Sequence, residues 1–120
     1  MNITDAERQI VEAALEVHKN LGLGFTEPAY KQALAYELEL RKIPYERQKK
    51  VKVSYKGNVA DEATLDLVVG DTVIVEVRAQ EPLSAADETK MKSYLKATKM
   101  GMGVLVDFGR DNLEIRSVNR

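Results

Sequence analysis

Apolar residues follow a helical period at the start of the chain. They recur every three or four residues there, which is typical of amphipathic helices. The pattern predicts one helix that opens at a T-x-x-E capping box formed by Thr4 and Glu7 and stops at Gly22. A second helix is predicted between a Thr26 cap and Pro44. The N-terminal third of the chain is therefore expected to be helical.

The middle of the chain changes to alternating apolar and polar residues, which indicates strands. Strands are expected at about 47–56, 60–69 and 72–79, with boundaries uncertain by a few residues. The pairs Gly57-Asn58 and Gly70-Asp71 between them are typical of tight hairpin turns. Three strands joined in this way predict an antiparallel meander.

A third helix and two further strands complete the pattern. Ser84 and Asp87 resemble another capping box, and the helix that they open precedes an apolar run at 102–106 and a strand at about 113–118. The order is α-α-β-β-β-α-β-β. It predicts one domain over residues 1–120, an α/β fold with a mixed sheet whose three-stranded antiparallel meander is flanked by helices.

Composition restricts the classes of function. The chain carries 18 basic and 19 acidic residues, a net charge of -1, so any binding of nucleic acid needs a local basic patch. Residues 47–52 form the strongest basic cluster, which either contacts phosphates or protects an edge strand from aggregation. The absence of cysteine excludes disulfides and thiolate sites and is compatible with the expected cytoplasmic location. No apolar run approaches the roughly 20 residues of a membrane span, so no membrane association is expected.

Two acidic residues lie inside apolar runs. Asp66 lies between Leu65 and Leu67, and Glu76 follows an equally apolar stretch. Carboxylates in such surroundings need a partner, and a hard divalent cation such as Mg²⁺ or Mn²⁺ is one candidate. The predicted hairpin makes the two carboxylates near cross-strand neighbours, and Arg78 shares a strand face with Glu76. The alternative is a cross-strand ion-pair network on an exposed sheet face.

A short motif lies where the second helix is predicted to begin. Gly24 to Tyr30 reads G-x-x-E-x-x-Y, and the chain resembles the GxxExxY family, small proteins assigned to the PD-(D/E)xK nuclease-like superfamily. The resemblance runs from about Glu7 to the end of the chain. The stretches that also support it are Ala33–Leu38, Lys42–Gln48, Val75–Ala79, Ser93–Lys96 and Phe108-Gly109.

The resemblance implies a restriction-endonuclease-like core and roles for particular residues. Glu27 would be the acidic residue on the helix beside the site, Asp66 and Glu76 would be metal ligands, and Arg78 stands where the family usually has its catalytic lysine. Arginine keeps the charge but cannot lose a proton at useful pH. Lys90 replaces a frequent glutamine, which suggests that the catalytic cation has moved from strand to helix. The alternative is that Lys90 is simply solvated.

Three functional hypotheses follow. The first is a magnesium-dependent nuclease that hydrolyses phosphodiesters, for which the carboxylates of Glu27, Asp66 and Glu76 should converge within about 4–6 Å. The second is a catalytically inactive descendant that binds nucleic acid or a protein partner. The third is a structural homodimer module that uses an edge strand or the first helix. The pattern of residues does not identify the substrate.

Overall fold

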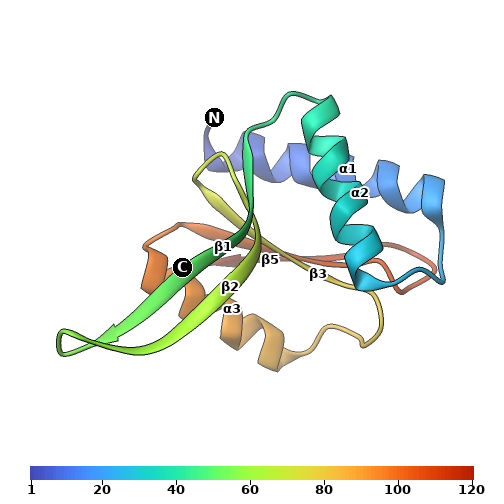
Figure 1. Ribbon diagram of the computed structural model, residues 1–120. Coiled ribbons are helices and arrows are strands. Elements are labelled where there is room, and N and C mark those ends of the chain that lie inside the picture. The colour runs from blue at the N-terminus through green and yellow to red at the C-terminus, as the bar shows by residue number, and fades with distance from the viewer.

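The computed structural model describes all 120 residues, which form three helices and one five-stranded sheet (Figure 1). None of the helices combines the length and the apolar composition needed to cross a lipid bilayer. The elements along the chain are α1 (Ile3–Leu21), α2 (Glu27–Leu40), β1 (Tyr45–Tyr55), β2 (Asn58–Val69), β3 (Val73–Arg78), α3 (Ala85–Thr98), β4 (Met102–Asp107) and β5 (Glu114–Asn119).

The sheet is mixed, as the sequence predicts. Its spatial order is β1-β2-β3-β4-β5, so each strand pairs with its neighbour in the chain. All pairs are antiparallel except β3 with β4, which is parallel. A parallel pair requires a crossover, and α3 supplies it. The predicted antiparallel meander and the α-α-β-β-β-α-β-β order are confirmed.

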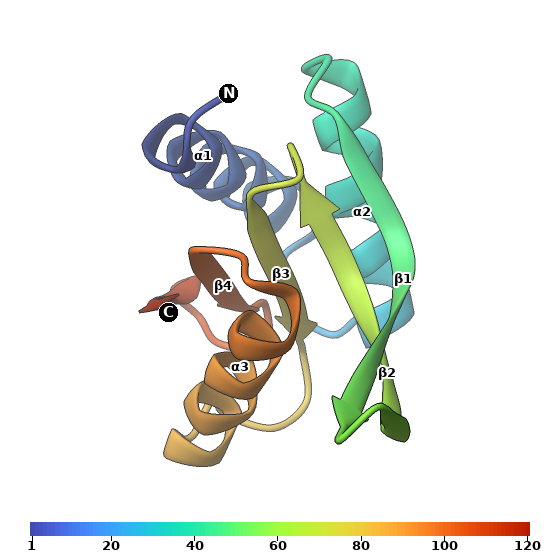
Figure 2. The ribbon, with the colours of Figure 1, turned by 90° about the vertical axis from the view of Figure 1, so that its left-hand side faces the viewer.

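Helices cover both faces of the sheet, with α1 and α2 on one side and α3 on the other (Figures 1 and 2). Each layer has its own group of buried apolar residues. In β3, Val73, Val75 and Val77 pack in the α1–α2 layer. Residues two apart on a strand share a face, so Glu76 and Arg78 lie on the α3 face. The sequence prediction that they share a face is thus confirmed.

The predicted capping box of the first helix is wrong. Asn2 caps α1 instead, because its Oδ1 accepts the backbone N–H of Asp5 at 2.8 Å. The helix therefore begins one residue before Thr4. The carboxylate of Glu7, the other half of the predicted box, accepts a hydrogen bond from the Ser117 hydroxyl on β5. A better placed acceptor at Asn2 thus displaced the local motif.

The caps of the other two helices are as predicted. Thr26 Oγ1 accepts the Ala29 amide at 3.3 Å, and α2 ends at Leu40, ahead of Pro44. At α3, the Ser84 amide donates to Asp87 Oδ2 at 2.9 Å. The N-termini of α2 and α3 therefore begin where the sequence places them, and both adjoin the site described below.

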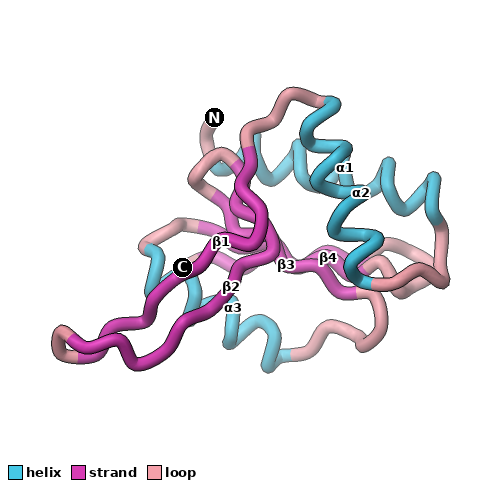
Figure 3. The backbone as a smooth tube through the Cα atoms, in the orientation of Figure 1, coloured by secondary structure: helices cyan, strands magenta, loops and turns pink.

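The β1–β2 hairpin is long and projects beyond the rest of the sheet (Figure 3). Its turn is Lys56-Gly57, with φ of 49° and 83°, between the paired residues Tyr55 and Asn58. The predicted turn at Gly57-Asn58 was one residue late. The Gly70-Asp71 turn is confirmed, and both of its residues have positive φ.

Two glycines permit close approaches that position the site. A Cβ on Gly103 would lie 2.2 Å from the sulfur of Met91, which is buried, so α3 packs on β4 only because this residue has no side chain. A Cβ on Gly109 would lie 2.1 Å from the carbonyl oxygen of Ala79. Glycine at these positions therefore fixes the helix and the segment that follow β3.

Candidate functional site

The ladder between β2 and β3 ends after three residue pairs. The last pair is Leu67 with Val75, and one further step in the same register would place Asp66 opposite Glu76. The main chains separate there instead. The Val77 amide donates to Asp66 Oδ2 at 2.9 Å, so a carboxylate takes the place of a backbone acceptor. The two acidic residues therefore mark the point where the strands diverge.

The side chains of β2 also change the face of the sheet toward which they point, at the place where β2 and β3 diverge. Leu67 and Val69 pack in the α1–α2 layer, whereas Leu65 packs in the α3 layer. Residues 65 and 67 of a regular strand would share one face. Opposite Asp66, Gln48 of β1 adopts φ of +50°. Both strands are thus twisted at Asp66, and the twist opens a space beside it.

Glu76 faces that space with an unsatisfied carboxylate. Its Oε1 is buried and has no hydrogen-bond partner. The pKa of Glu76 is raised to about 9, first by burial and then by the adjacent Asp66 carboxylate, while the positive charge of Lys31 acts in the opposite direction. A buried polar atom without a partner is costly and calls for an explanation.

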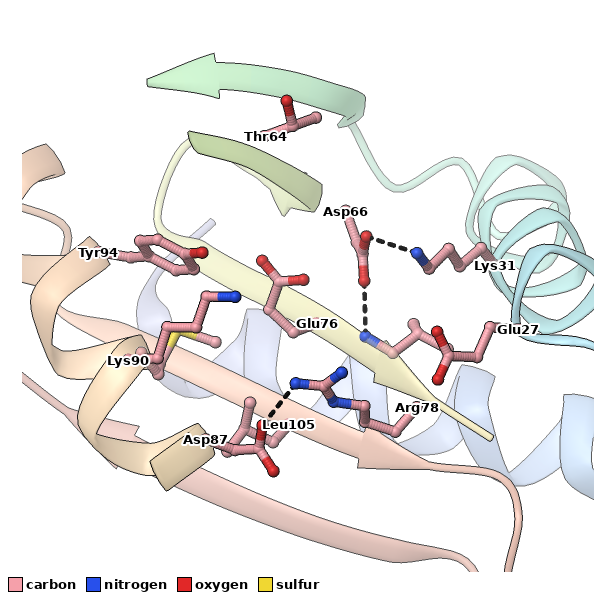
Figure 4. Close-up of a pocket in the computed structure, with 12 residues that line it drawn as sticks. Glu27, Lys31, Thr64, Asp66, Glu76, Arg78, Asp87, Lys90, Tyr94 and Leu105 are labelled. Atoms are coloured by element: carbon pink, nitrogen blue, oxygen red, sulfur yellow. Dashed lines mark hydrogen bonds and ion pairs between the residues drawn. The ribbon is translucent and has the colours of Figure 1, made fainter. Parts of the chain in front are cut away.

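Lys31 is a site residue that sequence reasoning missed. Its Nζ lies 2.9 Å from Asp66 Oδ1 and forms an ion pair with it (Figure 4). Lys31 follows Glu27 by four residues on α2, and side chains with this spacing share one helical face. The spacing could have placed Lys31 beside Glu27, but its contact with Asp66 depends on how α2 packs against β2.

Arg78 is tied to the start of α3. Its Nη2 donates to Asp87 Oδ1, and the same carboxylate caps α3 through Ser84. Burial tends to lower the pKa of Arg78, but the Asp87 carboxylate outweighs this and raises it. Burial likewise tends to raise the pKa of Asp87, yet the Ser84 amide and the Arg78 guanidinium lower it. Sequence reasoning identified Asp87 only as a cap.

Lys90 and Glu27 complete the surroundings from opposite sides. Lys90 is exposed, and its Nζ lies 5.7 Å from the centroid of the Tyr94 ring. Glu27 Oε1 accepts the backbone N–H of Ala79 at 3.3 Å, just after Arg78. Glu27 therefore anchors the end of β3.

These residues surround one pocket of about 200 Å³ (Figure 4). The structure brings all five sequence-predicted site residues into its wall: Glu27, Asp66, Glu76, Arg78 and Lys90. Elements from both helical layers contribute, because the divergence of β2 and β3 lets side chains of α2 reach the α3 side of the sheet. The pocket thus combines carboxylates with three cationic side chains.

The expected convergence of three carboxylates does not occur. No group of three or more His, Cys, Asp or Glu side chains is arranged to hold a metal ion, and Glu27 bonds to the Ala79 amide. Two carboxylates remain, and Mg²⁺ is commonly bound by one or two carboxylates, with water and substrate phosphates completing its shell. The unpartnered Oε1 of Glu76 and the all-oxygen donors of Asp66 fit such a hard cation.

Tyr30 supports the site from the core. Its hydroxyl donates to the Gly22 carbonyl at 2.6 Å, and its ring stacks on Phe108 with centroids 4.9 Å apart. The residue is fully buried and belongs to the core. His18 Nε2 lies 2.9 Å from the Arg110 carbonyl oxygen.

Comparisons with known proteins agree with this fold. A family model described as the PD-(D/E)XK nuclease superfamily matches residues 4–118. The fold is similar to that in the crystal structure of SSO0001, with a TM-score of 0.63 at 14% identity. That match covers 78% of this chain and 50% of the other, so this chain spans about half the length of that protein. No curated protein matches the chain. The predicted restriction-endonuclease-like core is confirmed.

Glu76 should make the protein less stable as the pH rises when no divalent cation is bound. Its pKa is about 9 in the folded protein against an ordinary value of 4.5. Between these values the folded state keeps a proton that the unfolded state has released, so the free energy of unfolding should fall as the pH rises. Urea unfolding with a chelator, at several pH values, measures this fall. It should be absent in Glu76→Gln, and an identical pH dependence of the two proteins would contradict the prediction.

Removing Lys31 should destabilise the protein. Lys31→Met leaves Asp66 without its cation, and both side chains are mostly buried, 24% and 11% exposed. We expect the free energy of unfolding at neutral pH to fall by about 1–3 kcal/mol. The matched control is Arg8→Met, which breaks an ion pair with Glu12 whose side chains are 57% and 47% exposed; it should cost less than about 1 kcal/mol. Equal losses in chemical denaturation would argue against a structural role for the Lys31–Asp66 pair.

Proposed function

The chain belongs to the PD-(D/E)XK nuclease superfamily, and from this premise we propose that it is a divalent-metal-dependent phosphodiesterase acting on nucleic acid. The proposal rests on one observation. Two carboxylates meet where β2 and β3 diverge, and the buried Oε1 of Glu76 has no partner within the protein. A cation bound there would satisfy that atom and offset the repulsion between Glu76 and Asp66.

Asp66 and Glu76 would hold Mg²⁺ or Mn²⁺. When bound, such a cation supplies Lewis-acid chemistry: it polarises a phosphoryl oxygen and lowers the pKa of a water. Lys31 neutralises Asp66 when no cation is present. When a cation binds, Lys31 must either share the Asp66 carboxylate with it or move away. If Lys31 moves away, its ammonium is free to bind a phosphate oxygen.

The remaining side chains have electrostatic and positioning roles. Arg78 stays charged and cannot act as a base, so it serves to stabilise the negative charge that develops on the phosphoryl oxygens. Asp87 fixes the direction of its guanidinium. Lys90 forms no ion pair with a carboxylate and is the third cationic side chain of the pocket. Glu27 acts as a positioning residue through the Ala79 amide.

A second candidate is a protein that binds nucleic acid without cutting it. Two contacts favour it: Arg78, in the place of the family lysine, is tied to Asp87, and Lys31 occupies an oxygen of Asp66. A site in which Arg78 and Lys31 are already paired with carboxylates resembles a stable ion-pair network as much as an active centre. Metal binding and cleavage, measured separately, distinguish the two candidates.

Within the superfamily we assign the chain to the GxxExxY family, on the motif from Gly24 to Tyr30. The motif has a structural reason in this fold. Tyr30 holds the Gly22 carbonyl, and Glu27 holds the Ala79 amide, so the segment joins α2 to the end of β3. The absence of cysteine suits a cytoplasmic protein.

Neutralising both carboxylates should abolish metal binding. We expect wild-type protein to bind Mn²⁺ in calorimetric titration and to nick a supercoiled plasmid in its presence. Asp66→Asn with Glu76→Gln should remove both properties because no anionic ligand remains. The control pair Asp71→Asn with Glu39→Gln makes the same charge change at exposed residues outside the pocket and should retain both. A wild-type protein that binds no metal would overturn the proposal, and binding without cleavage would support the second candidate.

Lys90 should contribute to cleavage but not to folding. Its side chain is exposed at the pocket, so Lys90→Ala should lower the metal-dependent nicking rate by about 10²-fold with little change in stability. Lys92→Ala is a matched control on the same helix, exposed and outside the pocket. If the Lys90 variant cuts as fast as the control, Lys90 has no catalytic role.

A further inference from the structure

Two further cavities lie beyond the site, between α3 and the outer part of the β1–β2 hairpin. The inner cavity shares Lys90 and Tyr94 with the site pocket. The outer cavity shares Val53 and Ser93 with the inner one. The three spaces therefore follow one another from the acidic pair along α3 toward its C-terminal end. We call the two cavities together the hairpin cleft, whose polar lining on the basic side is Lys52, Ser54, Lys90, Ser93 and Lys96.

The hairpin projects from the sheet and α3 lies beside it (Figure 2), and residues of both elements line the cleft. Lys52 comes from β1, whereas Lys90 and Lys96 come from α3. All three side chains are exposed. None has a carboxylate within the 4.0 Å of an ion pair. Each wall thus carries lysine side chains that form no ion pair within the protein.

This distribution differs from that of the rest of the molecule. The chain as a whole carries a net charge of -1. Helix α1 carries four acidic and two basic residues, not counting His18. The outer cavity of the hairpin cleft has two lysines and two serine hydroxyls in its wall and no acidic residue. Lysines that lie near one another and form no ion pair favour an anionic partner.

We propose that the hairpin cleft binds the sugar–phosphate backbone of a nucleic-acid strand that runs from the Asp66–Glu76 pair along α3 toward its C-terminal end. That the strand begins at the Asp66–Glu76 pair rests on the proposed function. Lysine ammonium groups and serine hydroxyls are the usual donors to phosphate oxygens. The side chains of Val53, Ala97 and the half-buried Tyr94 provide apolar contacts between them. Contacts of this kind position a strand without reading its sequence.

Two acidic residues oppose a phosphate backbone in the inner cavity. Asp61 and Glu62 line it from β2. Asp61 Oδ1 accepts the Glu62 amide at 2.8 Å, and Glu62 is the register partner of Lys52 across the hairpin. Their charges should weaken binding. The cleft therefore allows substitutions of both charge types to be tested. Neutralising a lysine should weaken the affinity for nucleic acid, and neutralising Glu62 should strengthen it.

The test is fluorescence anisotropy with labelled single-stranded DNA, single-stranded RNA and duplex DNA of one sequence, in EDTA so that no strand is cut. Lys52→Gln with Lys96→Gln should weaken binding about tenfold and reduce the slope of log K against log salt by about 1.4, or 0.7 for each phosphate contact to a single strand. Lys19→Gln with Lys42→Asn removes the same charge from exposed residues outside the cleft and should leave both quantities unchanged. Glu62→Gln should tighten binding.

The outcomes separate this inference from the proposed function. If the variant with Lys52→Gln and Lys96→Gln binds the probes as tightly as the control variant with Lys19→Gln and Lys42→Asn, the inference is overturned. A wild-type protein that binds none of the three probes would also overturn it. The variant with Asp66→Asn and Glu76→Gln should still bind the probes in EDTA, because it leaves the cleft intact. Loss of metal binding or cleavage without loss of probe binding would therefore count against the nuclease and not against the cleft. The probe bound most tightly identifies the strand type.

Discussion

The site depends on the hydrogen bond from the Val77 amide to the Asp66 carboxylate, at the point where β2 and β3 separate. A continuing ladder would have closed this space with main-chain bonds and placed Glu76 against β2. A side-chain acceptor satisfies the amide while the strands remain apart. The separation lets Lys31 of α2 approach from one layer and Lys90 of α3 from the other, so one irregular position assembles a pocket from elements distant in the sequence.

The charges of the pocket are almost paired. Asp66 has Lys31, Asp87 has Arg78, and Glu27 has the Ala79 amide. Among the carboxylates of the pocket, only Glu76 has a buried oxygen with no hydrogen-bond partner. Its pKa is raised because the charged form is buried there. Buried carboxylates either bind a proton or bind a cation. The proposed metal site and the pH dependence of stability are therefore two consequences of one unpaired group.

The sequence predicted those features that local patterns determine. The turn at Gly70-Asp71 fixed the register of β2 and β3, so the opposition of Asp66 and Glu76 followed from counting residues. Lys31 and Asp87 were missed as site residues because their partners depend on how α2 and α3 pack on the sheet. The cap at Thr4 failed because Asn2 caps the helix two residues earlier, through the Asp5 amide, so that Thr4 lies within the first turn.

The expected approach of Glu27 to the acidic pair failed for a related reason. The spacing of the motif placed Glu27 on the correct helix, but it could not reveal the free amide of Ala79 that the end of β3 exposes. Main-chain groups at strand ends need acceptors, and a glutamate within reach satisfies one. Local spacing therefore identifies the element that carries a residue, whereas its partner is decided by tertiary packing.

The most direct test of the central claim is the anomalous X-ray signal of Mn²⁺ in crystals of this protein. The account predicts a peak beside Asp66 and Glu76, with the previously unpartnered carboxylate oxygen of Glu76 among the ligands. An anomalous map with no peak at this pair at saturating Mn²⁺, and with Lys31 still bound to Asp66, would contradict it.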